Sequence, residues 1–164
     1  MKYLKTITAI GILFITSSFH LVNKSNLTIQ KPNSSSSTSD ASKSILGYWT
    51  TEKKDLKVRV YLESGKYCGK LVDFVCDCKI KTSAESHKDT RNPDPSYRGN
   101  SWIGTKILWD LKYEGGDRWI AGEIYDMTSG GIYSSVVTLT NGKIDVRGYW
   151  GFEFIGKSMT FVRP

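Results

Sequence analysis

The chain has little that would identify a common enzyme. Among its 164 residues we identify no nucleophile elbow, no phosphate-cradling glycine loop and no histidine–glutamate metal helix. Of its two histidines, His20 falls in the N-terminal leader and His87 is alone in the rest of the chain. Helical periodicity is nearly absent as well. These absences argue against the enzyme classes that those motifs define and against a helical fold.

Long hydrophobic runs are also scarce. The one apolar run near the N-terminus, Ile7 to Ile15, is shorter than the about 20 residues that a membrane-spanning helix needs. Because Lys2 and Lys5 precede it, the run predicts a signal peptide over residues 1–22. The cleavage site is poor, which leaves an uncleaved N-terminal membrane anchor as the alternative. We expect an exported protein, either periplasmic or secreted.

Residues 23–44 lack aromatic side chains and include the polar run NSSSSTSDASKS. Such a composition cannot bury enough apolar surface to order itself, so it predicts a disordered linker. The folded part is then a single domain over residues 45–164, whose 120 residues suffice for one hydrophobic core.

The excess of positive charge weakens once the leader and linker are set aside. The whole chain has a net charge of +7, but residues 1–44 hold five lysines and one aspartate, which leaves +3 for the domain. No basic cluster with interleaved aromatic residues stands out there. Nucleic-acid binding requires a concentrated basic footprint, so we predict no nucleic-acid partner.

The few cysteines fall within eleven residues, at Cys68, Cys76 and Cys78. In an exported chain we expect an oxidised pair and one remaining thiol. The spacing of Cys76 and Cys78 is tight for a relaxed disulfide, which favours Cys68 paired with one of them. A zinc site would need a fourth ligand, for which only His87 is near, so we predict no metal site.

What the sequence does contain is a series of short strand-like segments separated by glycine turns. Residues 57–62 alternate strictly, with Val58, Val60 and Leu62 on one face, as in a half-buried antiparallel strand. Asn141-Gly142 is a strong hairpin signal that demands positive φ at both residues. The predicted strands cover residues 47–51, 57–62, 67–74, 103–113, 118–125, 132–140, 143–149 and 158–163. This pattern fits a sandwich or an up-and-down barrel, and we predict the barrel because closure removes exposed strand edges.

The longest irregular stretch, residues 75–101, ends in a loop that is dense in turn chemistry. Its distinctive residues are Asp89, Asn92, Pro93, Asp94 and Arg98. The prolines fix the backbone and Asx side chains bond to nearby backbone groups. The spacing of Asp94 and Arg98 also allows a two-pronged ion pair. We interpret the loop either as a structural closure at one end of the fold or as a ligand-binding or catalytic loop.

Several ordered motifs together resemble one known bacterial family, and the resemblance spans the folded part. They are Gly47-x-Trp49, Gly69-Lys70-Leu71, Asp89-x-x-Asn92-Pro93-Asp94-Pro95-x-x-Arg98, Gly104, Trp119-x-x-Gly122-x-Ile124-Tyr125-Asp126, Tyr133, Val146-Arg147-Gly148-Tyr149, Gly156 and Arg163. The family is domain of unknown function 2147 (DUF2147). The resemblance implies an all-β, lipocalin-like (calycin-type) antiparallel barrel in an exported protein with no established activity. Three positions depart from the family pattern: Asn100-Ser101-Trp102 replaces an Arg-Pro-Leu run, Gly131-Ile132-Tyr133 replaces Gly-Lys before tyrosine, and Phe161 replaces a tryptophan.

A small barrel holds either packed side chains or one small ligand. We predict a small hydrophobic or amphiphilic ligand, with no cofactor. The candidate ligand-binding residues are Trp49, Trp102, Trp119, Tyr125, Tyr133 and Arg147. The aromatic ones can equally fill the core.

Two alternatives from other classes stay open. In the first, the barrel is filled and the protein is a structural or interaction module whose partner is another envelope protein. In the second, His87, Asp89, Asn92 and Asp94 form a hydrolytic or cation-binding site on the 87–98 loop. A continuous cavity would favour the ligand-binding hypothesis, and convergence of His87 with the carboxylates on a cleft would favour the enzyme.

Overall fold

The computed structural model describes residues 40–75 and 87–164. The chain divides into two units, Met1–Pro32 and Asn33–Pro164, and all described residues belong to the second. The predicted leader and most of the predicted linker lie outside the described residues. Residues 40–43, at the end of the predicted linker, form a helical turn, and Ile45 is fully buried. Within the described residues, no helix has the length and apolarity to span a membrane.

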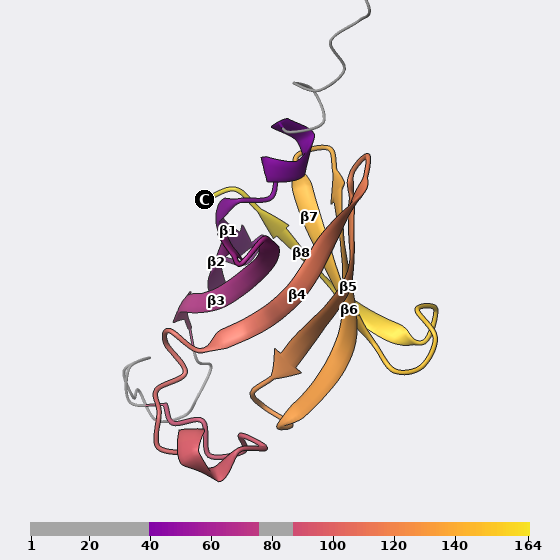
Figure 1. The fold of residues 1–164 in the computed structure, drawn as a ribbon. Helices are drawn as coiled ribbons and strands as arrows, with labels where there is room; N and C mark the ends of the chain where they lie inside the picture. Colours follow the sequence, from indigo (N-terminus) through magenta and orange to yellow (C-terminus); the bar gives the residue numbers. More distant parts are fainter. Residues whose placement is uncertain (1–39, 76–86) are drawn as a thin grey trace, which may run out of the picture. The chain divides into compact units, whose positions relative to one another are not determined.

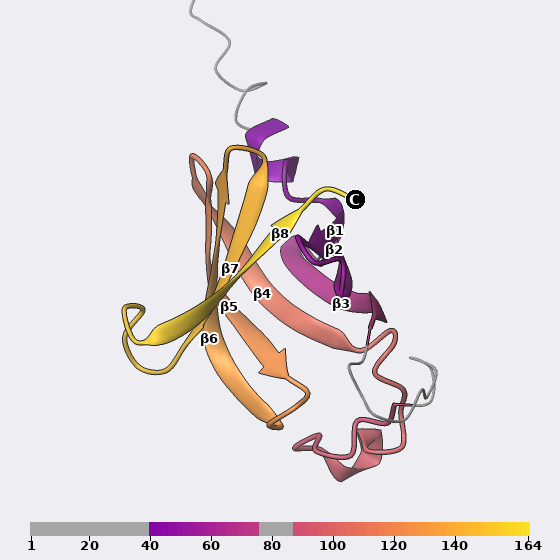
Figure 2. The ribbon, with the colours of Figure 1, turned by 180° about the vertical axis from the view of Figure 1, so that it is seen from behind.

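The described part of the chain forms eight antiparallel strands that close into a barrel in sequence order (Figures 1 and 2). The closing contact pairs the first strand with the last, through Thr50 with Val162 and Thr51 with Phe161. This confirms the predicted up-and-down barrel. The elements are β1 (Gly47–Thr51), β2 (Leu56–Glu63), β3 (Lys66–Phe74), the short 3-10 helix η2 (Pro95–Tyr97), β4 (Lys106–Gly115), β5 (Arg118–Asp126), β6 (Gly131–Thr140), β7 (Lys143–Tyr149) and β8 (Gly156–Val162).

Local sequence explains most strand limits. Asn141 and Gly142 have φ values of 51° and 75°, as the β6–β7 hairpin requires. Strand β4 begins at Lys106 rather than at residue 103, because Gly104 turns the chain with a φ of 88°. In β2 the alternation places Val58 and Val60 in the core, whereas Leu62 at the strand end is exposed.

The barrel interior is filled by a continuous hydrophobic core. Its largest fully buried side chains include Trp49, Trp119, Leu71 and Leu111. The structure therefore supports the core-filling alternative for the tryptophans of β1 and β5. At the end where the described chain begins and ends, the Trp49 indole donates to the Ile45 carbonyl at 2.7 Å. The Arg163 guanidinium lies 3.8 Å from the centre of the Trp49 ring, which closes this end.

Loop 87–105 lies at the opposite end of the barrel from the C-terminus (Figures 1 and 2). It runs past the ends of β4, β5 and β6 and is the second part of the connection between β3 and β4. The polar loop singled out by the sequence therefore covers one mouth of the barrel.

Candidate functional site

Loop 87–105 is closed on itself by backbone hydrogen bonds. Lys88 and Ser101 form an isolated antiparallel bridge. Next to it, the Asp89 amide donates to the Asn100 carbonyl and the Trp102 amide donates to the His87 carbonyl, both at 2.9 Å. The loop thus leaves and re-enters the barrel as a short two-stranded stem, with η2 at its tip.

The tip is shaped by Asx turns. The Asn92 Oδ1 atom accepts from the Asp94 amide at 2.9 Å. Asp94 caps η2, because its Oδ1 atom accepts from the amide of Ser96 at 2.9 Å and from the Ser96 hydroxyl at 2.8 Å. These hydrogen bonds lower the pKa of Asp94.

The expected two-pronged pair of Asp94 with Arg98 is not among the ion pairs of the described residues. Instead, Arg98 Nε donates to the Asn92 carbonyl at 2.8 Å. The reason is local: Asp94 is engaged by the first turn of η2, while Arg98 stands at its C-terminal end and reaches back to the start of the loop.

Asp89 fastens the loop to the barrel wall. Only 1% of its surface is exposed. Its Oδ1 atom accepts a 2.6 Å hydrogen bond from the Tyr125 hydroxyl, and its Oδ2 atom accepts from the Asn92 side-chain amide, also at 2.6 Å. Both oxygens of a buried carboxylate are thus satisfied. Burial, and then the bond to Asp89, raise the pKa of Tyr125 well above its ordinary value.

A second attachment joins the loop to the β5–β6 turn. Arg91 Nη1 donates to the Thr128 carbonyl at 2.5 Å. On the same turn Gly130 has a φ of +81°, and a Cβ atom there would lie 2.3 Å from the Arg91 carbonyl oxygen. Only glycine permits this approach.

An open cavity of about 930 Å³ lies between the loop and the barrel wall. It is lined by Lys88, Asp89, Asn92, Pro93, Asp94, Tyr97, Gly99, Asn100, Ser101, Ile103, Gly104, Thr105, Lys106, Trp109, Tyr125 and Ile132. The lining combines aromatic and aliphatic side chains from the loop, β4, β5 and β6 with two lysines and two aspartates. A second cavity, beside Thr50, Phe74 and Pro164, holds only about 200 Å³.

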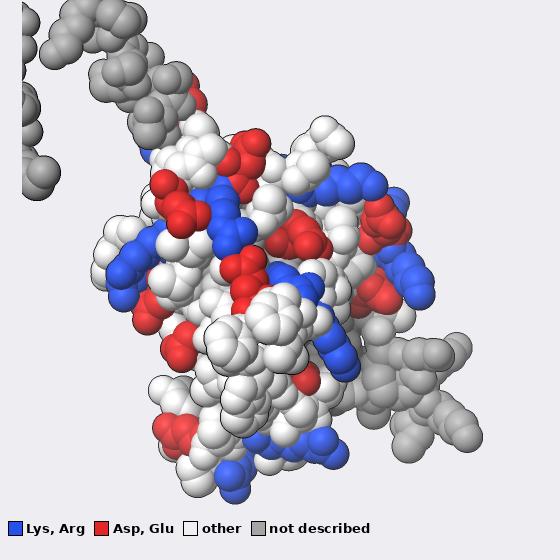
Figure 3. Space-filling model, turned by 90° about the vertical axis from the view of Figure 1, so that its right-hand side faces the viewer, with Lys and Arg blue, Asp and Glu red and all other residues white. Residues whose placement is uncertain are grey.

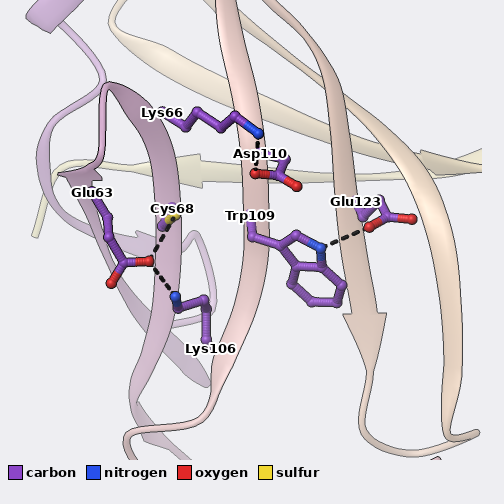
Figure 4. Close-up of polar contacts among 7 residues, drawn as sticks. All are labelled: Glu63, Lys66, Cys68, Lys106, Trp109, Asp110 and Glu123. Atoms are coloured by element: carbon purple, nitrogen blue, oxygen red, sulfur yellow. Dashed lines mark hydrogen bonds and ion pairs between the residues drawn. The ribbon is translucent and has the colours of Figure 1, made fainter.

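Two lining residues of β4 are held in place on the barrel wall (Figure 4). The Trp109 indole nitrogen donates to Glu123 Oε2 of β5 at 2.7 Å. Lys106 forms an ion pair with Glu63. Farther along the wall, Lys66 pairs with Asp110 at 2.7 Å. The hydrogen bond to Glu123 thus fixes the position of the Trp109 ring on the barrel wall.

The six candidate ligand-binding residues lie in different parts of the structure. Tyr125 lines the cavity, while Trp49 and Trp119 belong to the core. Trp102 packs under the loop against Phe74 and His87, with ring centroids 5.2 and 5.5 Å away. Tyr133 lies beside Trp150, 6.5 Å between centroids. Arg147 holds the β7–β8 loop through the Glu153 carbonyl. A ligand contact by any of them stays a prediction.

The family-motif loop residues are better gathered: Asp89, Asn92, Pro93 and Asp94 all line the cavity. Arg98 is not among the lining residues and instead braces the loop. The sequence interpretation missed several other lining residues, among them Lys88, Tyr97, Ile103, Lys106, Trp109 and Ile132.

His87 does not converge with the carboxylates. Its ring lies 5.1 Å from Phe74 and 5.5 Å from Trp102, measured between centroids, and it is not part of the cavity lining. In the described part of the chain, no group of three histidine, cysteine or acidic residues is placed to hold a metal ion. The site is therefore a pocket of mixed polarity.

Cys68 is a buried free thiol on β3. Its Sγ atom is 3.8 Å from Glu63 Oε2 (Figure 4), and burial raises the pKa of the thiol. Cys76 and Cys78 lie outside the described residues, so the predicted disulfide stays a prediction.

The absence of a phosphate-loop pattern from the sequence needs a correction. Residues 151–158, GFEFIGKS, match the letters of such a loop. The pattern requires a helix after the loop, and here strand β8 follows instead. The amides of Trp150, Phe152 and Ile155 donate to carbonyls within the same loop, so they are not aimed at an anion.

Comparison with known proteins identifies a family and a fold. The family described as "Uncharacterized protein conserved in bacteria (DUF2147)" matches residues 47–163. The solved structure of protein HP1028 from the human pathogen Helicobacter pylori, described as belonging to the lipocalin family, superposes with a TM-score of 0.61 at 23% sequence identity. The match covers 73% of this chain and 82% of that one, and it shows the fold alone. No curated protein matches the chain in sequence.

Proposed function

Since the chain belongs to the DUF2147 family of uncharacterised bacterial proteins and has a lipocalin-like barrel, we propose that it binds a small amphiphilic molecule. The binding site is the open cavity between loop 87–105 and the barrel wall rather than the barrel interior. We propose that it acts outside the cytoplasm, in the periplasm or after secretion, as the leader over residues 1–22 suggests.

The observation that carries this proposal is the size and composition of the cavity. Its volume of about 930 Å³ lies within the range of about 300–1,000 Å³ that small-molecule sites occupy. Tyr97, Ile103, Trp109 and Ile132 supply the apolar contacts. Because Trp109 is fixed by Glu123 and the loop is fixed by Asp89, binding would require little ordering of the protein.

Among the four charged residues of the lining, Lys88 is the candidate partner of an anionic head group, while Asp94 at the loop tip carries the opposite charge. Lys106 is neutralised by Glu63, and Asp89 is satisfied by Tyr125 and Asn92. Lys88 has no ion pair among the described residues, so its ammonium group is available to a ligand. A carboxylate near Lys88, with an apolar tail against Trp109 and Ile132, matches this distribution.

The filled core also agrees with the second hypothesis, a structural or interaction module, which predicts that the cavity binds nothing. The acid–base or cation-binding hypothesis has less support, because His87 lies outside the cavity.

The test is a calorimetric titration of the full chain with dodecanoate, which is an anionic amphiphile. Ile132→Asp places a repelling charge in the cavity at a half-exposed position and should abolish binding. The matched control is Leu62→Asp, because Leu62 is equally exposed but does not line the cavity. Binding that survives Ile132→Asp, or that Leu62→Asp removes as well, would refute the cavity as the site. Native mass spectrometry of the chain recovered from cells would show the mass of any natural ligand.

A further inference from the structure

Four exposed large apolar side chains lie close together in sequence on the connection between β7 and β8. We call residues 150–155 the aromatic loop. The exposed fractions of Trp150, Phe152, Phe154 and Ile155 are 78%, 66%, 78% and 55%. The loop projects outward from the barrel (right-hand side of Figure 1). Exposure of several large apolar side chains together marks an interaction surface.

The loop is built to hold these side chains outside. The Trp150 amide donates to the Ile155 carbonyl at 3.3 Å, and the Ile155 amide donates to the Phe152 carbonyl at 2.9 Å. The rings of Phe152 and Phe154 stack with centroids 5.5 Å apart and an angle of 15°. The exposed rings therefore belong to a defined, self-bonded turn.

Arg147 of β7 donates to two further carbonyl groups of the loop. Its Nε atom donates to the Glu153 carbonyl at 2.7 Å, and Nη2 donates to the Phe154 carbonyl at 3.1 Å. The loop's one acidic side chain, Glu153, is neutralised by Arg118 of β5 at 2.7 Å. Paired backbone groups and the absence of an unpaired charge lower the cost of entering an apolar phase. In this loop the carbonyl groups of Trp150, Phe152, Glu153, Phe154 and Ile155 accept hydrogen bonds, and Glu153 is paired.

Charged residues surround the apolar patch rather than interrupt it. Figure 3 shows the face onto which the loop projects, with uncharged atoms at its centre and lysine, arginine and acidic side chains around them. Lys157, an exposed residue near the start of β8, lies two residues after the loop. Among the described residues, Lys157 has no ion pair. A cation beside an aromatic tip can contact the phosphate groups of lipids.

We propose that the aromatic loop inserts into the interface of a lipid bilayer and holds the barrel at a membrane surface. Tryptophan and phenylalanine next to basic residues are the composition of interfacial anchors. A standard protein–protein interface covers about 800 Å² per partner, which is more than a six-residue projecting loop supplies. This anchor is separate from the ligand cavity, so either proposal can fail without the other.

The test measures binding of the full chain to vesicles made from equal parts of phosphatidylcholine and phosphatidylglycerol. Phe152→Ser with Phe154→Ser should weaken vesicle binding at least about tenfold, because two large apolar side chains no longer leave water. The matched control is Tyr48→Ser with Leu62→Ser, which removes two exposed apolar side chains elsewhere on the barrel. Any contribution of the leader is the same in all three proteins.

A second measurement locates the loop. Vesicles with brominated acyl chains should quench the fluorescence of the wild-type chain more than that of Trp150→Leu, because Trp150 is the one tryptophan of the aromatic loop and 78% of its surface is exposed. Protection of the 150–156 amides from hydrogen exchange should appear on addition of vesicles and be lost in the double phenylalanine variant. Equal vesicle binding by the loop variant and the control would overturn the proposal. Self-association that needs no lipid and disappears in the loop variant would also overturn it, by assigning the loop to contact between copies.

Discussion

The hydroxyl group of Tyr125 on β5 donates a 2.6 Å hydrogen bond to the buried carboxylate of Asp89, thirty-six residues earlier in the chain. This contact makes the loop at the barrel mouth a fixed wall of the cavity. The other carboxylate oxygen accepts from the Asn92 side chain, so Asp89 hydrogen-bonds both to its own loop and to the barrel. Because these hydrogen bonds tie loop 87–105 to β5, the loop can form a fixed side of the cavity.

The first prediction concerns the hydrogen bond between Tyr125 and Asp89. Tyr125→Phe removes the hydroxyl and leaves one oxygen of buried Asp89 without its donor. Such a loss typically costs about 1–3 kcal/mol. We expect the free energy of unfolding to fall by this amount in urea denaturation and hydrogen exchange to rise in residues 88–102.

The control for this variant is Tyr97→Phe, since Tyr97 is on the same loop but its side chain is exposed. Equal stability of the wild type and Tyr125→Phe would show that the Asp89–Tyr125 contact does not hold the loop.

The second prediction concerns the close approach of the loop to the β5–β6 turn. Gly130→Ala puts a Cβ atom 2.3 Å from the Arg91 carbonyl oxygen and forces alanine into a positive φ. We expect a loss of at least about 2 kcal/mol in the free energy of unfolding. Gly142→Ala is the matched control, because Gly142 has a similar φ of +75° but open space around its Cβ position.

Thermal unfolding of both alanine variants separates the two effects. Gly142→Ala should cost only the backbone strain, about 1 kcal/mol, and should leave the loop in place. If both variants lose the same stability, the contact with Arg91 is not required, and the loop is free to move away from the turn.

Much of this fold could be predicted from local sequence. The alternation of Val58 and Val60 and the Asn141-Gly142 turn each depend on neighbouring residues, so they are visible in the chain itself. The ion pair expected from the spacing of Asp94 and Arg98 was wrong, because Pro95 starts a 3-10 turn that uses the aspartate as a cap.

The cavity could not be predicted in the same way. Asp110 has a positive φ of 61° next to Trp109, which breaks the alternation that would assign the tryptophan to a face of β4. The contact of Asp89 with Tyr125 spans the barrel mouth and leaves no local pattern. The exposure of the aromatic loop was not predicted, because the sequence of residues 150–155 does not show whether the rings face the core or the solvent.

The third prediction concerns acid. Burial raises the pKa of Asp126, but hydrogen bonds from Thr128 and Ser129 outweigh it, so the pKa lies below its ordinary value of 3.8. A lowered pKa in the folded state means that this carboxylate stabilises the protein above pH 3.8. That contribution is lost as the pH falls from 3.8 through the lower folded-state value.

Asp126→Asn removes the titrating carboxylate and with it this dependence of stability on pH. We expect the wild type to be more stable than this variant near neutral pH, and the difference between them to shrink as the pH falls below 3.8. Urea denaturation across the acid range measures it. A difference that stays constant with pH would contradict the prediction. Asp94, whose pKa is also lowered, leaves further acid dependence in both proteins.

The last prediction concerns Cys68 and distinguishes the free thiol of the structure from the expected disulfide. Burial raises the pKa of the thiol, so little of it is present as the reactive thiolate. Glu63, which is paired with Lys106, contacts the sulfur atom and limits the access of a reagent to it. Alkylation of the native full chain with iodoacetamide should therefore label Cys68 at least about tenfold more slowly than an exposed thiol.

Unfolding then separates the two states. If Cys68 is free, denaturant alone makes it react at the rate of an ordinary cysteine. If it is paired with Cys76 or Cys78, denaturant has no effect until a reductant is added, and the linked peptides are recovered by mass spectrometry. Because export through an oxidising compartment favours pairing, a disulfide in chain recovered from whole cells with thiols blocked at lysis would support export. Its absence from that material would contradict the predicted disulfide of Cys68 and agree with the free thiol of the structure.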